Sequence, residues 1–220
     1  MTSASPAIAW TALVLAGGRS SRLGNQDKAA ITIGGASALD RLLSSLPRGV
    51  PIVVAGPERP TPRPVTFRRE RPIFGGPAAG IASGLGAVST PVTVLLAVDM
   101  PWAGELVEHL IAEFAKCDRD ALVPVDRSGF RQPLCAVVRT EALRAALAEL
   151  GDPAGRSLRD LISLLDFQER PLSEAEMRWV HDIDTPEDLR EARSMAAQSR
   201  VAAPPSGTDE SPIKNPGVQP

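Results

Sequence analysis

Apolar residues in the 220-residue chain gather in short runs that contain few polar positions. Four such runs span residues 11–15, 50–55, 92–98 and 121–125. Most of them are apolar at successive positions, whereas a strand with one solvated face alternates between apolar and polar residues. Because strands buried on both faces have this pattern, the runs predict the strands of a mostly parallel sheet.

Helical patterns lie between the apolar runs. Residues 37–46 begin with Ser37, a favourable helix cap, and a second helix is expected over 104–116. Its apolar face has helical spacing and consists of Val107, Leu110, Ile111 and Phe114. Strands that alternate with helices predict an α/β fold, a doubly wound three-layer αβα sandwich.

The second half of the chain differs in its pattern. A turn at 126–129 leads to an apolar stretch over 132–138, which predicts an antiparallel strand added to the parallel sheet. Helices are expected over 140–150 and 157–165, followed by a short strand at 182–184. The last helix has its own start signal, with Thr185 as cap, Pro186 at the first helical position and Asp188 completing a capping box.

The length suits one domain with two tails. We expect residues 1–10 to be a loose N-terminal segment and residues 11–195 to form the domain. From residue 196 to residue 220 the composition changes to Pro, Ser, Gly and Ala with almost no large apolar residue, which predicts a disordered C-terminal tail.

The charge and the cysteine content of the chain indicate what kind of molecule it binds and in which compartment it acts. The chain has 24 Lys and Arg against 26 Asp and Glu, a net charge of −2, so no basic field indicates a nucleic-acid surface. Cys117 and Cys135 are its two cysteines, and as free thiols they indicate a reducing, cytoplasmic location. The apolar run at 7–16 has no basic residue before it, and no stretch has membrane-spanning length. We expect the protein to act on small-molecule substrates and not to associate with a membrane.

A glycine-rich, basic loop follows the first expected strand, over residues 13–28. Gly17 and Gly18 allow backbone N–H groups to approach a phosphate closely. The loop also carries three cations, which are Arg19, Arg22 and Lys28. Neither the G-x-G-x-x-G spacing of a dinucleotide fold nor the G-K-[ST] of a P-loop is present. The loop therefore predicts a different kind of nucleotide-phosphate site, and the alternative is a glycine turn followed by a solvated basic loop.

A carboxylate ends a second apolar run, because Asp99 follows the strand expected at 92–98. Ligands of doubly wound sheets bind at the carboxyl ends of the strands, so we expect Asp99 to lie beside the phosphates. A carboxylate there is costly unless it is paired, and Mg²⁺ commonly binds one or two carboxylates together with phosphate oxygens. The alternative is that Asp99 caps a helix that begins near Ala103.

Two further segments carry candidate residues. The glycine-rich stretch 75–85 predicts a loop that turns into a helix near Pro77, packed closely against another backbone or against a flat base. Residues 59–71 contain five arginines and three prolines, with only 65–67 resembling a strand. This segment is either a basic lid over anionic ligands or a solvated loop, and Glu70 is its candidate metal or ribose ligand.

Five motifs follow one another along the chain, namely L-A-G-G-R-S-S-R-L-G-x-x-D-K at 15–28, G-G-P-A-A-G-I at 75–81, V-D-M-P at 98–101, Q-P-L-C-A-V at 132–137 and D-I-D-T-P-E-D-L at 182–189. Together, over about residues 11–195, they resemble the molybdenum cofactor guanylyltransferases of the MobA-like nucleotidyltransferase superfamily. The first is specific for the superfamily, and Asp27-Lys28 together with Gln132-Pro133-Leu134 indicates this branch.

The resemblance implies a Rossmann-like nucleotidyltransferase fold, GTP and molybdopterin (or its molybdenum-loaded form) as substrates, and Mg²⁺ as cofactor. The backbone from Leu15 through Ala16 and Gly17 to Gly18 would hold the nucleotide, Lys28 the phosphates and Asp99 the metal. Transient contact with the molybdenum enzymes that receive the cofactor, or with their chaperones, is compatible with this role.

The chain departs from the family pattern at three places. Glu70 is the nearest acid to the place where the family usually has an aspartate before the second glycine stretch. Ala97 replaces a frequent cysteine, and Asp182 and Asp184 stand where the family has asparagines. The first departure leaves open which group replaces that aspartate, and the others leave open which residues contact the pterin.

The predicted reaction is attack of the terminal phosphate of molybdopterin on the α-phosphorus of GTP, with release of pyrophosphate. Asp99 would hold Mg²⁺, while Lys28, Arg22 and Arg19 offset the charge that develops on pyrophosphate. Two alternatives are a CTP-dependent cytidylyltransferase for the same pterin and a sugar or lipid-precursor nucleotidyltransferase. A third, from a different class, is a non-catalytic carrier of nucleotide or cofactor.

Overall fold

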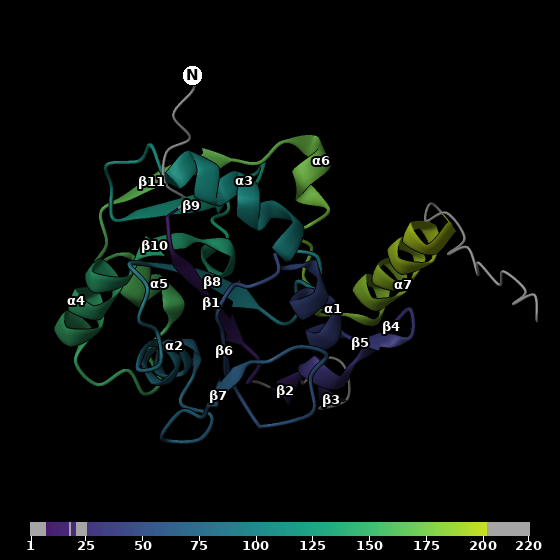
Figure 1. Ribbon diagram of the computed structural model, residues 1–220, viewed down its shortest axis with the longest axis horizontal. Helices are drawn as coiled ribbons and strands as arrows, with labels where there is room; N and C mark the ends of the chain where they lie inside the picture. Colours follow the sequence, from purple (N-terminus) through teal and green to yellow (C-terminus); the bar gives the residue numbers. More distant parts are fainter. Residues whose placement is uncertain (1–7, 18, 21–25, 202–220) are drawn as a thin grey trace, which may run out of the picture.

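A seven-stranded sheet forms the middle of the computed structural model, which describes residues 8–17, 19–20 and 26–201 (Figure 1). Six of the strands run parallel, and β10 is antiparallel to both of its neighbours, β8 and β9. The strand order is β11 (Phe167–Pro171), β9 (Ala121–Val125), β10 (Val137–Arg139), β8 (Val92–Ala97), β1 (Trp10–Leu15), β6 (Ile52–Ala55) and β7 (Thr66–Arg68). The predicted mostly parallel sheet with one added antiparallel strand is confirmed.

Helices cover both faces of this sheet (Figure 1). One face packs against α1 (Ala38–Ser45), α3 (Gly104–Phe114), α7 (Pro186–Val201) and the short α6 (Glu174–Met177). The other face packs against α2 (Pro77–Leu85), α4 (Thr140–Leu150) and α5 (Leu158–Ile162). Along β1 the buried residues alternate, so that Ala12 and Val14 enter the first core and Leu13 and Leu15 the second. This is the three-layer αβα sandwich that the sequence predicts.

Two small sheets and a turn follow β1 along the chain. The first sheet pairs β2 (Arg19–Ser20) with β3 (Gln26–Asp27), and the second pairs β4 (Thr32–Ile33) with β5 (Ala36–Ser37). Between them the 3-10 turn η2 (Lys28–Ala30) begins at Asp27, whose side chain accepts a hydrogen bond from the Ala29 N–H at 3.0 Å. This cap fixes the backbone that carries Lys28.

The helix start signals of the sequence are confirmed. Ser37 Oγ accepts a hydrogen bond from the Asp40 N–H at 3.0 Å and so caps α1. At α7 the Thr185 N–H donates to Asp188 Oδ2 at 2.7 Å, and the Asp188 N–H donates to Thr185 Oγ1 at 3.2 Å. These two bonds are a reciprocal capping box, which satisfies two backbone donors at the start of the helix.

Helix α2 lies very close to β1 because it contains glycine where a side chain would overlap the strand. A Cβ at Gly84 would overlap the Leu13 side chain, and one at Gly80 would lie 3.1 Å from Leu15 Cδ2. The sequence left open whether this glycine-rich helix packs against a backbone or a flat base. Its contact with β1 confirms the close packing.

Two predicted strands differ from the structure: the strand predicted at 132–138 is shorter, and the one predicted at 182–184 is absent. The stretch 132–138 contains the 3-10 turn η3 (Pro133–Cys135), and β10 begins only at Val137. Pro133 has no N–H to donate to a sheet, so it cannot continue a central strand. Residues 182–184 form no strand, because the chain crosses the end of the sheet there. The Ile183 N–H donates to the Asp99 carbonyl at 3.0 Å, and the Asp184 N–H donates to the cap residue Asp188.

Two elements extend past the predicted limits of the domain, residues 11 and 195. Trp10, expected in the loose N-terminal segment, begins β1. Helix α7 continues to Val201, past the boundary predicted at residue 195, and Ala196 is buried in the first core. Residues 1–7 and 202–220 lie outside the described residues. None of the helices in the described part of the chain combines the length and the hydropathy that a membrane crossing requires.

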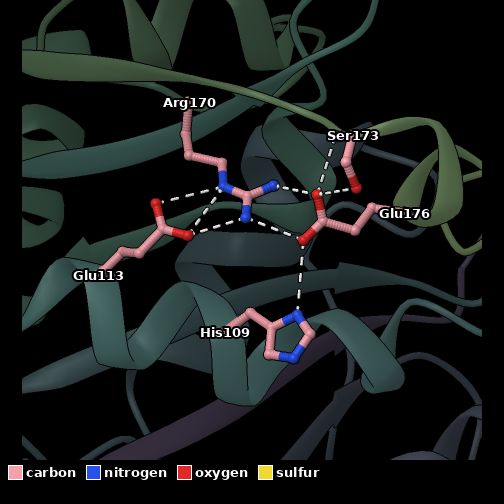
Figure 2. Close-up of polar contacts among 5 residues, drawn as sticks. All are labelled: His109, Glu113, Arg170, Ser173 and Glu176. Atoms are coloured by element: carbon pink, nitrogen blue, oxygen red, sulfur yellow. Dashed lines mark hydrogen bonds and ion pairs between the residues drawn. The ribbon is translucent and has the colours of Figure 1, made fainter.

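A charge network joins β11 and α6 to α3 (Figure 2). The Arg170 guanidinium donates to Glu176 at 2.5 and 2.8 Å and to Glu113 at 2.8, 3.1 and 3.3 Å. Glu176 also accepts from the backbone N–H and the hydroxyl of Ser173, and His109 Nδ1 lies 3.4 Å from Glu176 Oε1. The Arg170 hydrogen bond is the main cause that lowers the pKa of Glu176 to about 2. The network attaches the segment after β11 to the rest of the fold.

Candidate active site

The carboxyl ends of β1, β6 and β8 lie side by side at one edge of the sheet. Leu15 is in register with Ala55 on one side and with Ala97 on the other. Just beyond the strands, the Ala16 N–H donates to the Ala55 carbonyl at 2.9 Å, and the Val98 N–H donates to the Leu15 carbonyl at 3.0 Å. The glycine loop after β1 and Asp99 after β8 are therefore neighbours, as the sequence predicts.

A pocket of about 490 Å³ opens at this edge. It brings together six of the predicted site residues, which are Leu15, Ala16, Gly17, Lys28, Glu70 and Asp99. The rest of its lining comes from β6, β8, the start of α2 and the loops beside them, namely Ala55, Phe74, Gly76, Pro77, Gly80, Ala97, Val98 and Leu134. The pocket is apolar along the strand ends and charged where Lys28 and Asp99 meet.

Lys28 lies between two carboxylates at the charged end of the pocket. Its Nζ donates to Asp99 Oδ2 at 2.7 Å and to Asp184 Oδ1 at 2.5 Å. The three side chains keep 19%, 23% and 39% of their surface exposed, respectively. The cluster is therefore partly shielded from water and still accessible to a ligand in the pocket.

The pKa shifts at this cluster show an excess of negative charge. Burial by itself would lower the pKa of Lys28, but Asp99 and Asp184 outweigh it, so the pKa lies above its ordinary value. Burial also raises the pKa of Asp182, and the negative charges of Asp184 and Asp99 raise it further. Two carboxylates thus hold the ammonium group, and a third, Asp182, feels the charge of both, an arrangement that favours the binding of a further cation.

Glu70 is buried with 7% of its surface exposed, although it comes from an arginine-rich segment. Its Oε1 accepts a hydrogen bond from the Phe74 N–H at 3.1 Å. A Cβ built on Gly17 would lie 3.4 Å from the same oxygen, so the glycine allows the carboxylate to approach the loop after β1 closely. Glu70 therefore lies at the end of the pocket that contains Gly17. Its carboxylate oxygens are candidate acceptors for hydrogen bonds from a bound nucleotide.

The arginines around Glu70 have different surroundings. Arg59 Nη2 donates to Asp27 Oδ2 at 2.8 Å, next to Lys28 in the chain. Arg63 donates to the carbonyls of Leu43, Leu46 and Pro47 near the end of α1. Residues 65–67, which resemble a strand, lie largely in β7. Two of the five arginines are thus attached to the fold.

The remaining predicted phosphate ligands are described only in part. Arg19 belongs to β2, where its backbone pairs with Asp27, and this places it in the loop that leads to Lys28. Gly18 and Arg22 lie outside the described residues. Their proposed contacts with phosphate stay predictions.

The alternative role of Asp99 as a helix cap is wrong, because α3 begins after Ala103 and Asp99 bonds to Lys28. Within residues 8–17, 19–20 and 26–201, no group of three or more His, Cys, Asp or Glu side chains encloses a metal position. Mg²⁺, however, is often held by one or two carboxylates, with phosphate oxygens and water completing its shell. Asp99 and Asp184, which converge on one cation and leave negative charge uncompensated, fit that kind of donor set.

Asp184 is the residue of this cluster that the sequence analysis did not assign to the site. It is the last residue of the wrongly predicted strand and immediately precedes Thr185, the cap of α7. A signal was available, since two aspartates stand immediately before a strong helix start signal in D-I-D-T-P-E-D-L. The backbone bond between Ile183 and Asp99 brings this segment to the strand ends.

The chain is similar to known nucleotidyltransferases. The family model of the MobA-like NTP transferase domain matches residues 12–174. A "probable molybdenum cofactor guanylyltransferase" of Natronomonas pharaonis is 33% identical over 198 residues, which cover 83% of this chain and 96% of that protein. A molybdenum cofactor guanylyltransferase of Mesorhizobium japonicum is 30% identical over 82% of this chain and 92% of its own length.

Solved structures share the fold. Molybdopterin-guanine dinucleotide biosynthesis protein A of Archaeoglobus fulgidus has a TM-score of 0.68 at 23% identity, covering 86% of this chain and 99% of its own. A 2-C-methyl-D-erythritol 4-phosphate cytidylyltransferase of Thermus thermophilus has a TM-score of 0.65 at 22% identity, covering 86% and 100%. With the family model matched over most of its length and relatives above 30% identity, the chain belongs to the MobA-like NTP transferase domain family.

Proposed function

We propose that the protein is a molybdenum cofactor guanylyltransferase, which transfers GMP from GTP to molybdopterin and releases pyrophosphate. The single observation that carries this proposal is the pocket at the ends of β1 and β8, where Gly17, Lys28 and Asp99 meet. The names of the relatives at 30–33% identity support the choice of GTP and pterin. The proposed site of action is the cytoplasm, in keeping with the two free buried cysteines.

The glycine loop and Glu70 would hold the nucleoside. Leu15, Ala16 and Gly17 line the pocket, and we propose that their backbone, continued through Gly18, holds the nucleotide and its phosphates. The Glu70 carboxylate offers acceptor oxygens, which suit the N–H groups of guanine or the hydroxyls of ribose. A nucleoside at this end directs its phosphates toward Lys28 and Asp99.

Lys28 would change partners when GTP binds. Its ammonium is held by Asp99 and Asp184 in the free protein. Phosphate oxygens offer it a stronger negative charge, so it would turn to the triphosphate and neutralise charge on the departing pyrophosphate, assisted by Arg19 and Arg22. Asp99 and Asp184 would then be available to a divalent cation.

Mg²⁺ bound there would supply Lewis-acid stabilisation of the phosphate oxygens. Asp99, with Asp184 beside it, would hold the ion. In the transfer itself, an oxygen of the terminal phosphate of molybdopterin forms a bond to the α-phosphorus of GTP. The bond from that phosphorus to the β-phosphate oxygen breaks, and pyrophosphate leaves. The protein contributes position and charge neutralisation, and no covalent enzyme intermediate is needed.

A pyrophosphate-release assay with molybdopterin and Mg²⁺ tests the proposal, with GTP and CTP supplied in separate reactions. The proposal predicts release from GTP that depends on the pterin. Preference for CTP would replace it by a cytidylyltransferase. Nucleotide binding without pyrophosphate release would indicate a carrier, and release that requires a sugar phosphate in place of the pterin would indicate another branch of the fold.

A further inference from the structure

Phe74 is an aromatic residue at the rim of the nucleotide pocket that the proposed reaction does not use. Its side chain lines the pocket and yet keeps 60% of its surface exposed. Large exposed aromatic residues at a ligand pocket are informative, since an aromatic ring offers a flat face to a heterocyclic base. Glu70, Pro77 and Gly80, which line the same pocket, surround the end where the nucleoside is proposed to bind.

The backbone holds Phe74 in a conformation that a bulky residue seldom adopts. Its φ is 65°, in the left-handed region where glycine is favoured. Hydrogen bonds on both sides fix this geometry: the Phe74 N–H donates to Glu70 Oε1, and the Gly75 N–H donates to the Pro72 carbonyl at 3.0 Å. The Gly75 carbonyl in turn accepts from the Gly155 N–H at 2.8 Å. Strain of this kind, held by surrounding contacts, is typical of functional sites.

Glu70 links the ring to the nucleoside end of the pocket. One carboxylate approaches the loop at Gly17 and also holds the backbone of Phe74. A base that bonds to this carboxylate therefore lies next to the residue that carries the ring. We infer that Phe74 is a base-stacking residue, which covers the purine of GTP while Glu70 accepts hydrogen bonds from its edge. This inference rests on the proposed function, because it takes the pocket to be the nucleotide site.

Calorimetry on the full chain, which measures the binding of GTP in the absence of the pterin, tests the inference. Stacking of a base on an aromatic side chain predicts that Phe74→Ala and Phe74→Gly weaken GTP binding about tenfold. Glycine relieves the backbone strain and alanine does not, so equal losses assign the effect to the ring. Inorganic tripolyphosphate, which has no base, should bind both variants as it binds the wild type.

A tryptophan variant and a neighbouring residue complete the experiment. Phe74→Trp should keep the affinity for GTP and show quenching of the added indole fluorescence on binding. Ile73, exposed by 53% and absent from the pocket lining, gives the matched control, and Ile73→Ala should bind GTP normally.

Wild-type affinity for GTP in both Phe74→Ala and Phe74→Gly would overturn the stacking role and leave the proposed function intact. Equal weakening of tripolyphosphate would also overturn it, since the ring would then act on the loop and not on the base. Absence of nucleotide binding in the wild type would overturn the proposed function, and the stacking role with it.

Discussion

Two clusters in this protein place one cation between two carboxylates, and they differ in what surrounds them. Arg170 joins Glu113 and Glu176 through five hydrogen bonds with nitrogen–oxygen distances of 2.5–3.3 Å (Figure 2). Lys28 joins Asp99 and Asp184 at the edge of the pocket, with Asp182 nearby as a third carboxylate.

The comparison shows how one arrangement serves two purposes. A guanidinium has a planar fork that matches carboxylates, and the Arg170 network uses it to attach β11 and α6 to α3. An ammonium is a compact charge on a flexible stem, which can exchange one oxygen partner for another. The first cluster should therefore act on stability, and the second on catalysis.

The largest expected effect follows from removing the ammonium at the pocket. Lys28→Ala should lower the turnover number for pyrophosphate release by about 100-fold or more, because a preorganised charge on the departing group is lost. The free energy of unfolding should change by only about 1 kcal/mol or less, since the ion pairs are partly exposed. Steady-state kinetics and urea unfolding measure the two quantities. A large loss of stability with normal turnover would reverse the roles of the two clusters.

Removal of Arg170 should have the opposite effect. Arg170→Ala leaves Glu176, 8% exposed, without its main partner, and the free energy of unfolding should fall by about 3 kcal/mol. Arg170→Lys keeps the positive charge but lacks the planar guanidinium, so its free energy of unfolding should lie between those of the wild type and Arg170→Ala. At temperatures where the variants stay folded, their turnover numbers should match the wild type. Urea unfolding that gives the same stability for all three proteins would contradict the account.

These two clusters also show the limits of sequence reasoning here. The buried strands, the caps at Ser37 and Thr185 and the meeting of Gly17 with Asp99 followed from local pattern and from the rule for strand ends. The partners of Lys28 and Arg170 depend on pairing between distant segments, which periodicity does not encode. The apolar run at 132–138 predicts a longer strand than β10, because the pattern does not register that Pro133 cannot donate to the sheet.

Acid should weaken the Arg170 network. The pKa of Glu176 is about 2 in the folded chain, against an ordinary value of 4.5. Its contribution to stability is thus complete above pH 4.5, declines as the unfolded chain takes up protons below that pH, and disappears near pH 2. Urea unfolding at intervals across this range should show a flatter pH dependence for Glu176→Gln than for the wild type. Parallel curves would mean that the network does not hold this carboxylate ionised.

The most direct test of the central claim is pyrophosphate release from GTP with molybdopterin and Mg²⁺, measured for the wild type and for Asp99→Asn. Asparagine keeps the size of the side chain and removes the charge that would hold the metal. The account predicts pterin-dependent release by the wild type and a loss of about 100-fold or more in the variant, with little change in its thermal midpoint. Equal release by the two proteins would contradict it.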